Sequence, residues 1–149
     1  ATFDLSASGF SSYTPFTGSA NQETWTFKLN DKVIYDLSFK TAVGEQVINL
    51  SGLTVNDAQF EMAIGRQAVT LPSAGHFEIR SAIGEVVIYV PRGVAVRVRV
   101  QKALTALQAP ADFTQSGNLV YSPGAAEASN ALEVEVHNAI GHISLQVLP

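Results

Sequence analysis

The sequence predicts an all-β fold built from stacked, solenoid-like repeats, and three observations support this prediction. A motif of alanine, an aliphatic residue and glycine recurs about every twenty residues, as in Ala42-Val43-Gly44 and Ala82-Ile83-Gly84, and a period of this length is typical of a repeat architecture. An alternating apolar run follows each motif, which is the period-two pattern of a β-strand. No stretch of the sequence has the period of a helix.

Each repeat is predicted to form one rung of two strands joined by a corner. When the repeats are aligned on Gly44, Gly65, Gly84 and Gly141, with Thr105 in a degenerate repeat, alternate positions on both sides of the corner are mostly apolar. These positions form inward columns, namely Gln46, Ile48, Leu50, Gln67, Val69, Leu71, Val86, Ile88, Val90, Ile143, Leu145 and Val147 after the corner, and Leu37, Phe39, Ala58, Phe60, Phe77, Ile79, Val98, Val100, Val134 and Val136 before it. The prediction is a single-stranded β-helix-like solenoid of about five two-strand rungs.

The outward columns predict how neighbouring rungs interact. Their members are Asp36, Asp57, His76, Arg97 and Glu133; Ser38, Gln59, Glu78, Arg99 and Glu135; and Lys40, Glu61, Arg80, Gln101 and His137. In sequence order, opposite charges neighbour one another more often than like charges, as cross-strand pairing favours. This order stacks the fourth repeat directly on the third, so Ile88 is expected to lie between Val69 and the fourth repeat.

The chain divides into an N-terminal segment and a repeat body. Residues 1–34 are expected to form a β cap or arm with strands at 2–6 and 24–29, because the end of a solenoid otherwise exposes unpaired backbone groups. Residues 35–149 form the repeat body, interrupted by a loop insertion at about 111–131. An insertion of this length is either a functional loop or an excursion that covers one face.

Composition limits the classes of function. The net charge is −4, with a pI near 5.2, and the few basic residues are not clustered, so neither nucleic acid nor an anionic membrane is expected as the main partner. The sequence has no cysteine and no apolar run of about 20 residues that could span a bilayer. It begins with Ala1 rather than Met, as expected of a processed or truncated chain.

Several short segments carry a resemblance to a known family. They are Asp36-Leu37-Ser38, Val43-Gly44-Glu45, Leu50-Ser51-Gly52-Leu53, Ile83-Gly84-Glu85-Val86, Tyr89-Val90-Pro91-Arg92-Gly93-Val94, Tyr121-Ser122-Pro123-Gly124 and Ile140-Gly141-His142-Ile143. Together they resemble the bacterial toast-rack domain, which is similar to the C-terminal region of the cell-wall-active antibiotic response proteins. The resemblance covers residues 36–147. It implies an extracytoplasmic β-solenoid-like domain, in a family whose members of known context sense or regulate envelope stress, and it brings no catalytic motif.

The histidines do not predict a metal site. His76, His137 and His142 fall in different columns of the repeat, whereas a zinc site needs three or four ligands that converge on the metal. With no cysteine in the sequence, no metal ligand and no cofactor-binding residue is predicted.

The carboxylates and serines do not predict a catalytic site either. Asp36 and Asp57 are expected to be neighbours, and Glu45 and Glu85 share a column with Arg66 between them. An interleaved arginine favours a structural charge ladder over an acid and base pair with separated pKa values. The serines lie in turns without a nucleophile elbow, so no catalytic residue is predicted.

One outward surface could bind a partner. Tyr89 and Val87 are expected to face outward beside Ala68 and Ser144, where they would form a modest apolar patch. We therefore predict a non-catalytic, extracytoplasmic module of the cell envelope, located at the cell surface or secreted, that interacts with or regulates an envelope component. Its expected partner is an envelope protein, a glycan or a second copy of the chain.

Two alternatives remain open at this point. The chain could be a structural subunit that assembles into a filament or oligomer through its N-terminal arm and its solenoid edges, because strand edges are ready to pair with another chain. It could also be a carbohydrate-active β-helix protein, since paired acids on a sheet face are used in glycoside cleavage.

Overall fold

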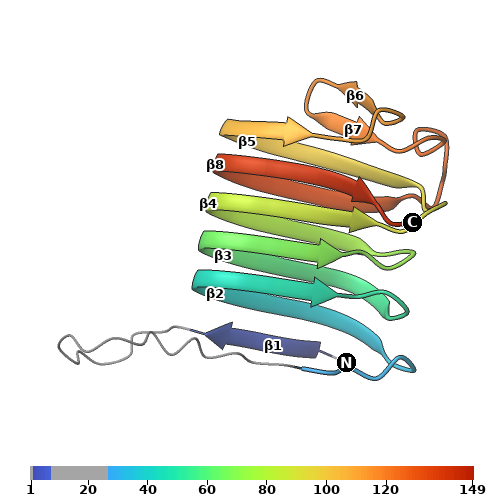
Figure 1. Cartoon of the computed structure of the whole chain (residues 1–149). Helices are drawn as coiled ribbons and strands as arrows, with labels where there is room; N and C mark the ends of the chain where they lie inside the picture. Colours follow the sequence, from blue (N-terminus) through green and yellow to red (C-terminus); the bar gives the residue numbers. More distant parts are fainter. Residues whose placement is uncertain (1, 8–26) are drawn as a thin grey trace.

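The computed structural model describes the backbone of residues 2–7 and all of residues 27–149, and this part of the chain consists of strands and connecting loops (Figure 1). Five long strands make up the body: β2 (Ile34–Asn49), β3 (Thr54–Thr70), β4 (His76–Val90), β5 (Val96–Gln108) and β8 (Leu132–Val147). Three short strands join them: β1 (Thr2–Ala7), β6 (Thr114–Ser116) and β7 (Leu119–Tyr121). The described residues contain no helix, and the all-β prediction is confirmed.

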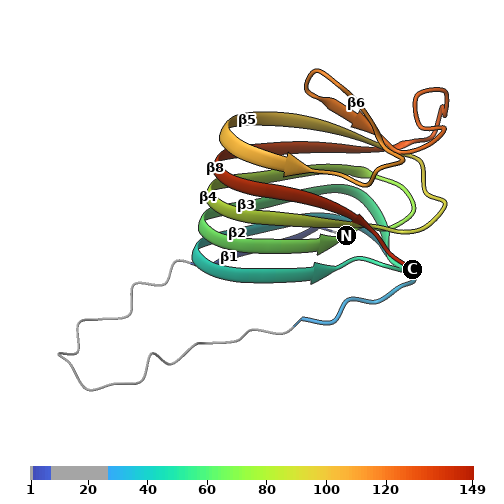
Figure 2. The ribbon, with the colours of Figure 1, turned by 45° about the horizontal axis from the view of Figure 1, so that its top comes forward.

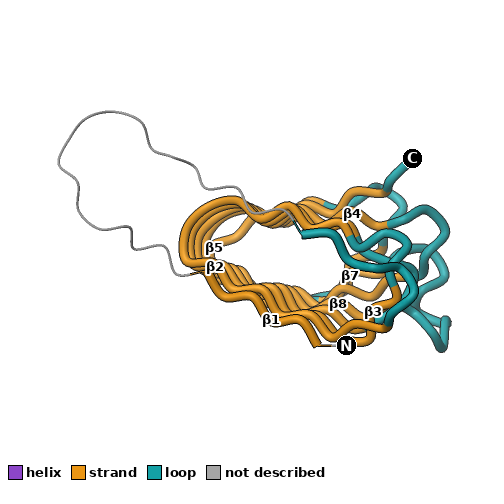
Figure 3. The backbone as a smooth tube through the Cα atoms, turned by 90° about the horizontal axis from the view of Figure 1, so that it is seen from below, coloured by secondary structure: helices purple, strands orange, loops and turns teal. Residues whose placement is uncertain are grey.

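Each long strand bends back on itself, so that one strand forms both sides of a flattened ring (Figures 2 and 3). The bend in β3 is at Gly65 and the bend in β4 is at Gly84, with φ of 144° and 145°, a region that L side chains rarely adopt. A Cβ on Gly65 would also lie 1.8 Å from the carbonyl oxygen of Gly44 in the next strand. Glycine at the corner thus lets the ladder continue through the bend, and the two strands predicted for each rung are one continuous strand.

The spatial order of the strands differs from their order in the sequence. The strands lie in the order β1-β2-β3-β4-β8-β5-β7-β6, with β8 between β4 and β5 (Figure 1). Ile88 therefore pairs with Val69 on one side and with Leu145 of β8 on the other, which corrects the prediction that the fourth repeat would follow the third. The segment between β5 and β8 carries the chain back past β5, so that the last repeat can occupy the gap.

The inward columns form the core of the molecule. Phe60, Phe77, Ile79, Val69 and Ile88 are each 0% exposed, as the period-two pattern predicts. The columns also bring one polar side chain inside, because Gln67 is 0% exposed. Its Nε2 donates a hydrogen bond of 3.2 Å to Oε1 of Gln46 in the neighbouring strand, so the polar pair is retained within the stack.

The revised strand order also changes the outward charge pairs. Glu78 of β4 lies next to Glu135 of β8, a like-charge pair that the sequence order had kept apart. Nη2 of Arg80 lies 2.6 Å from Oε1 of Glu78, and Nε2 of His137 lies 3.3 Å from Oε1 of Glu135. Arg80 thus compensates the charge of Glu78, and the imidazole of His137 lies against both carboxylates.

The two ends of the stack are closed differently. At one end β1 pairs in parallel with β2, from Thr2 opposite Asp36 to Ala7 opposite Thr41. The second strand predicted for the cap, 24–29, lies partly outside the described residues, and its described part, Phe27–Leu29, is not a strand. At the other end the antiparallel β6–β7 hairpin pairs with the first part of β5.

Candidate functional site

The insertion between β5 and β8 forms a structured surface beside β5. The strand β7 pairs antiparallel with β5, so that Arg97 lies opposite Tyr121 and Arg99 lies opposite Leu119. Val120, between the two outward residues of β7, is 1% exposed and belongs to the core. Because side chains alternate across a strand, Leu119 and Tyr121 share the outer face with the two arginines.

Arg97 fixes the turn that follows β7 against the outer face of the stack. Its Nε donates to the carbonyl oxygen of Ala125 at 2.9 Å, and its Nη2 donates to that of Ala128 at 2.5 Å. Its Nη1 also forms an ion pair of 2.8 Å with Oε1 of Glu133 in β8. At the base of the turn, the backbone N–H of Val96 donates to Oγ of Ser122 at 2.8 Å. Three hydrogen bonds, to Ala125, Ala128 and Ser122, therefore hold this turn over β5, and the ion pair with Glu133 fixes Arg97 to β8.

These elements enclose a pocket of about 290 Å³, which we call the insertion pocket. It is lined by Arg97, Arg99, Leu119, Tyr121, Ala126 and Glu133. Arg97 and Glu133 compensate each other's charge, whereas the guanidinium of Arg99 has no hydrogen bond or ion pair among the residues that the structure describes. The pocket thus presents one unengaged cation beside an aromatic and an aliphatic side chain.

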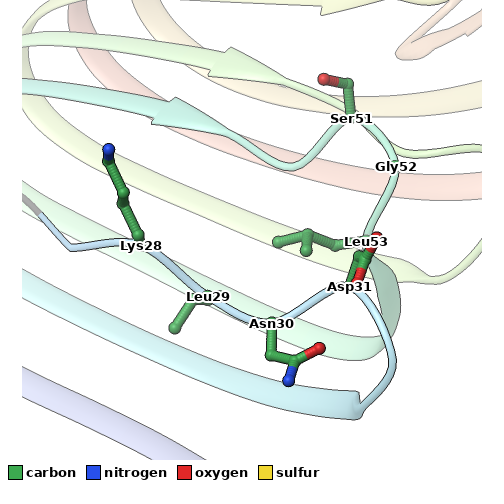
Figure 4. A pocket seen from close by; sticks show the side chains of 7 residues that line it. All are labelled: Lys28, Leu29, Asn30, Asp31, Ser51, Gly52 and Leu53. Atoms are coloured by element: carbon green, nitrogen blue, oxygen red, sulfur yellow. The ribbon is translucent and has the colours of Figure 1, made fainter.

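A second pocket, of about 670 Å³, lies at the opposite end of the molecule between residues 28–31 and the turn at 51–53 (Figure 4). It is a wide-open groove, and Figure 4 shows that its lining side chains point in different directions. Convergent polar groups are what fix the orientation of a ligand. The insertion pocket is therefore the better candidate site.

The three histidines that the sequence singled out are not brought together. Nδ1 of His76 lies 3.0 Å from Oδ1 of Asp57, and His137 lies beside Glu78 and Glu135. No group of three or more histidine, aspartate or glutamate side chains in residues 27–149 has the arrangement of a metal site.

The paired carboxylates are held in ion pairs. Nη1 of Arg66 lies 3.0 Å from Oε1 of Glu45, and its Nε lies 3.0 Å from Oε2 of Glu85. The hydrogen bond that Arg66 donates to Glu45, followed by the negative charge of Glu85, raises the pKa of Arg66 above its ordinary value. Oδ1 of Asp36 accepts a hydrogen bond from Asn56 at 3.0 Å. The arrangement is the charge ladder that the interleaved arginine predicts.

The apolar patch predicted around Tyr89 is wrong. Val87 is 2% exposed, and Ala68 and Ser144 are each 6% exposed, so these side chains offer almost no apolar surface to a partner. Several of the exposed apolar residues instead form a column along the bend, next to the corner positions, namely Val43, Ile64, Ile83, Ile140 and Leu104.

Sequence reasoning missed the insertion pocket, although one indication was present. Arg97 and Arg99 alternate with buried valines immediately before the insertion, which places two cations on the outer face where the inserted loop begins. The contribution of Leu119 and Tyr121 depended on how the loop folds. The loop has no periodic pattern from which the positions of these two side chains could have been predicted.

Fold and site together define a stacked β module with a pocket built by an insertion near one end. Residues 2–89 match the family profile described as the N-terminal domain of toast_rack, DUF2154, and the chain belongs to this family. The match includes β1, whereas the resemblance seen in the sequence began at Asp36. No curated protein matches the chain.

A solved structure shows the same fold. The crystal structure of a candidate cell adhesion protein from Clostridium sporogenes superposes with a TM-score of 0.68 and 17% sequence identity, over 87% of this chain and 68% of that one. At this identity the likeness shows the fold alone. The residues described here include no helix that is long and apolar enough to cross a membrane.

Proposed function

We propose that this chain is a non-catalytic module of the cell envelope that binds an envelope component through the insertion pocket, outside the cytoplasm. The observation that carries this proposal is the unengaged guanidinium of Arg99 in a pocket whose other charges, Arg97 and Glu133, are paired. A cation without a partner beside Tyr121 and Leu119 is suited to binding, and the one carboxylate of the lining, Glu133, is paired with Arg97.

The comparisons support an envelope role. The chain belongs to the toast-rack family, for which the resemblance in the sequence implies an envelope setting, and the solved neighbour is described as a candidate cell adhesion protein. Catalysis receives no support from the carboxylates, because Arg66 bridges Glu45 and Glu85 at 3.0 Å each. A binding or regulatory role therefore fits the site better than glycoside cleavage does.

The test is retention of purified envelope material by the immobilised protein. We expect wild-type protein to retain a specific glycan or protein component, and the double variant Arg99→Gln/Tyr121→Ala to lose it. Lys102→Gln is the matched control, because Lys102 is an exposed cation on the same strand outside the pocket. Equal retention by all three proteins would refute the proposed function.

A second proposal is self-association through the bare edge of β5. From Gln101 to Gln108 this strand pairs with β8 on one side, and no described residue forms a ladder with it on the other. Bare edges of this kind accept another strand. The exposed edge includes Leu104, which is 76% exposed.

The shape of this end favours a closed pair over a filament. The hairpin β6–β7 covers only the first part of β5, and β1 covers the first part of β2. In a head-to-tail stack the β6–β7 hairpin of one copy and β1 of the next would both lie between the first parts of β5 and β2. They would keep the second parts of these two strands too far apart to pair. In a dimer whose two-fold axis runs parallel to the strands, the β6–β7 hairpin of each copy would instead lie against the bare edge of the other copy.

Light scattering across a wide concentration range tests this second proposal. We expect a dimer at high concentration that Leu104→Lys converts to a monomer, because an inserted charge opposes edge pairing. A wild-type protein that stays monomeric throughout would exclude self-association, and long polymers would exclude the closed pair.

A further inference from the structure

We propose that the insertion pocket binds the carboxylate of a singly charged ligand, with Arg99 as the residue that holds the anion. This inference rests on the proposed function and specifies the chemistry of its ligand. The relevant carboxylates in an envelope are those of acidic sugars and of peptide C-termini, and both place a planar anion beside apolar C–H groups.

The ion pairs around Arg99 leave its guanidinium free to pair with a ligand. Arg97 is neutralised by Glu133 at 2.8 Å and also donates to two backbone carbonyls. Glu135 lies opposite Arg99 in the β5–β8 ladder, but its Oε1 accepts a hydrogen bond from Gln101 at 2.8 Å and lies 3.3 Å from Nε2 of His137. Glu135, the natural cross-strand partner of Arg99, thus directs its Oε1 toward Gln101 and His137, and it forms no ion pair with Arg99 among the residues that the structure describes.

The charge count favours a carboxylate over a phosphate. One unengaged guanidinium matches a single negative charge, whereas a phosphate dianion would add a second charge close to Glu133. The protein also has a net charge of −4, which opposes a highly charged anion at longer range. A planar guanidinium pairs with a carboxylate through two parallel N–H bonds, so a monoanion satisfies both its charge and its geometry.

The apolar lining gives the pocket a place for the rest of the ligand. Leu119 lies opposite Arg99 in the β5–β7 ladder, and Tyr121 lies two residues further along the same face. A tyrosine offers an aromatic body for C–H contacts and a hydroxyl for a hydrogen bond. A sugar acid or a C-terminal residue presents complementary groups next to its carboxylate.

The pocket is preorganised for this ligand. The wall formed by Ala126 belongs to the turn that Arg97 holds through the carbonyls of Ala125 and Ala128. The floor is hydrogen-bonded sheet, in which β7 pairs with β5. Binding therefore orders little protein beyond the Arg99 side chain, which reduces the entropic cost of association.

The test is calorimetric titration with defined probes. The sugar arm compares galacturonate, which has one carboxylate, with its methyl ester, and the peptide arm compares an N-acetylated tripeptide that has a free carboxylate with its amide. We expect either the sugar acid or the peptide acid to bind, and the neutral counterpart of that acid not to bind. Arg99→Gln should lower the affinity for the acid that binds by about tenfold or more, and Lys102→Gln should change that affinity by less than about twofold. Inorganic phosphate should bind more weakly than the preferred acid.

The two acids distinguish the source of the carboxylate, and equal melting temperatures of the two glutamine variants verify that both are folded. The inference is overturned if neither acid binds, if ester or amide binds as tightly as the acid, if phosphate binds more tightly, or if Arg99→Gln and Lys102→Gln weaken binding equally. Wild-type retention of envelope material without binding of either acid would refute the carboxylate and leave the proposed function standing. Binding of an acid without retention of envelope material would refute the envelope function alone.

Discussion

At the corner glycines two separate constraints act on one residue, and a pair of substitutions separates them. Gly84 has φ of 145°, and a Cβ there would lie 1.8 Å from the carbonyl oxygen of Gly65. Gly44 has nearly the same φ, 144°, but a Cβ there would meet no described atom within 4 Å. Gly44→Ala should therefore cost only the backbone strain, about 1–3 kcal/mol, and Gly84→Ala should cost distinctly more. Urea unfolding measures both, and equal losses would show that the close approach is relaxed without penalty.

The buried column makes a second prediction about single residues. Ile88 is 0% exposed between Val69 and Leu145, so Ile88→Asp buries an unpaired carboxylate at a cost of several kcal/mol, comparable to the stability of a small domain. Val47 is 75% exposed, and Val47→Asp introduces the same charge with little effect on thermal unfolding. Tyr89→Ser, at a partly buried position, should fall between the two. A Val47→Asp variant that melts as low as Ile88→Asp would contradict the register.

Side-chain direction was the property that the sequence predicted best. Period two sent Phe60, Val69 and Ile88 inward, and each is fully buried. It could not predict that Val87 would be 2% exposed on the outward face, because exposure there depends on how closely the longer neighbouring side chains pack. Direction is a property of one strand, whereas burial is a property of the assembled sheet.

Among the elements, the turn held by Arg97 is expected to loosen when its donors are removed. Arg97→Gln eliminates the bonds to Ala125 and Ala128 and the ion pair with Glu133. Hydrogen exchange should then become faster in residues 124–130 and stay unchanged in β3, because β4 and β8 lie between that strand and β5. The variant Arg99→Gln is the control, since the guanidinium of Arg99 forms no hydrogen bond or ion pair with the turn. Unaltered exchange in the turn would mean that Ser122 alone fixes it.

The insertion was the element that sequence reasoning could place but not describe. Its position followed from the missing glycine at Thr105 and from Pro110, both of which interrupt the repeat. Its short strands β6 and β7 have only three residues each, too few for a periodic pattern to be read. The pocket therefore had to come from the structure, although the alternation of Arg97 and Arg99 before it was visible.

At the scale of the whole molecule, the spatial order of the strands could not be predicted from the sequence. All five long strands carry the same inward columns, so hydrophobic pattern alone lets β5 or β8 stack equally well on β4. The charge columns even favoured the wrong order, because the true one places Glu78 beside Glu135. Arg80 compensates the charge of Glu78 from a neighbouring position, which a column-by-column comparison does not reveal.

The strand order can be tested by cross-linking, because the sequence has no cysteine and every engineered disulfide can be interpreted. Glu85 of β4 pairs with His142 of β8, and His142 pairs in turn with Ala106 of β5. Adjacent parallel strands lie about 4.8 Å apart, within the range of Cα separations that a disulfide spans, whereas strands two apart exceed it. Glu85→Cys/His142→Cys should therefore oxidise readily to an intramolecular disulfide in the folded protein. Glu85→Cys/Ala106→Cys, the pair that sequence order would have made neighbours, should remain reduced. Gel mobility under non-reducing conditions distinguishes the two, and efficient closure of the second pair alone would place β5 against β4 and remove β8 from the middle of the stack.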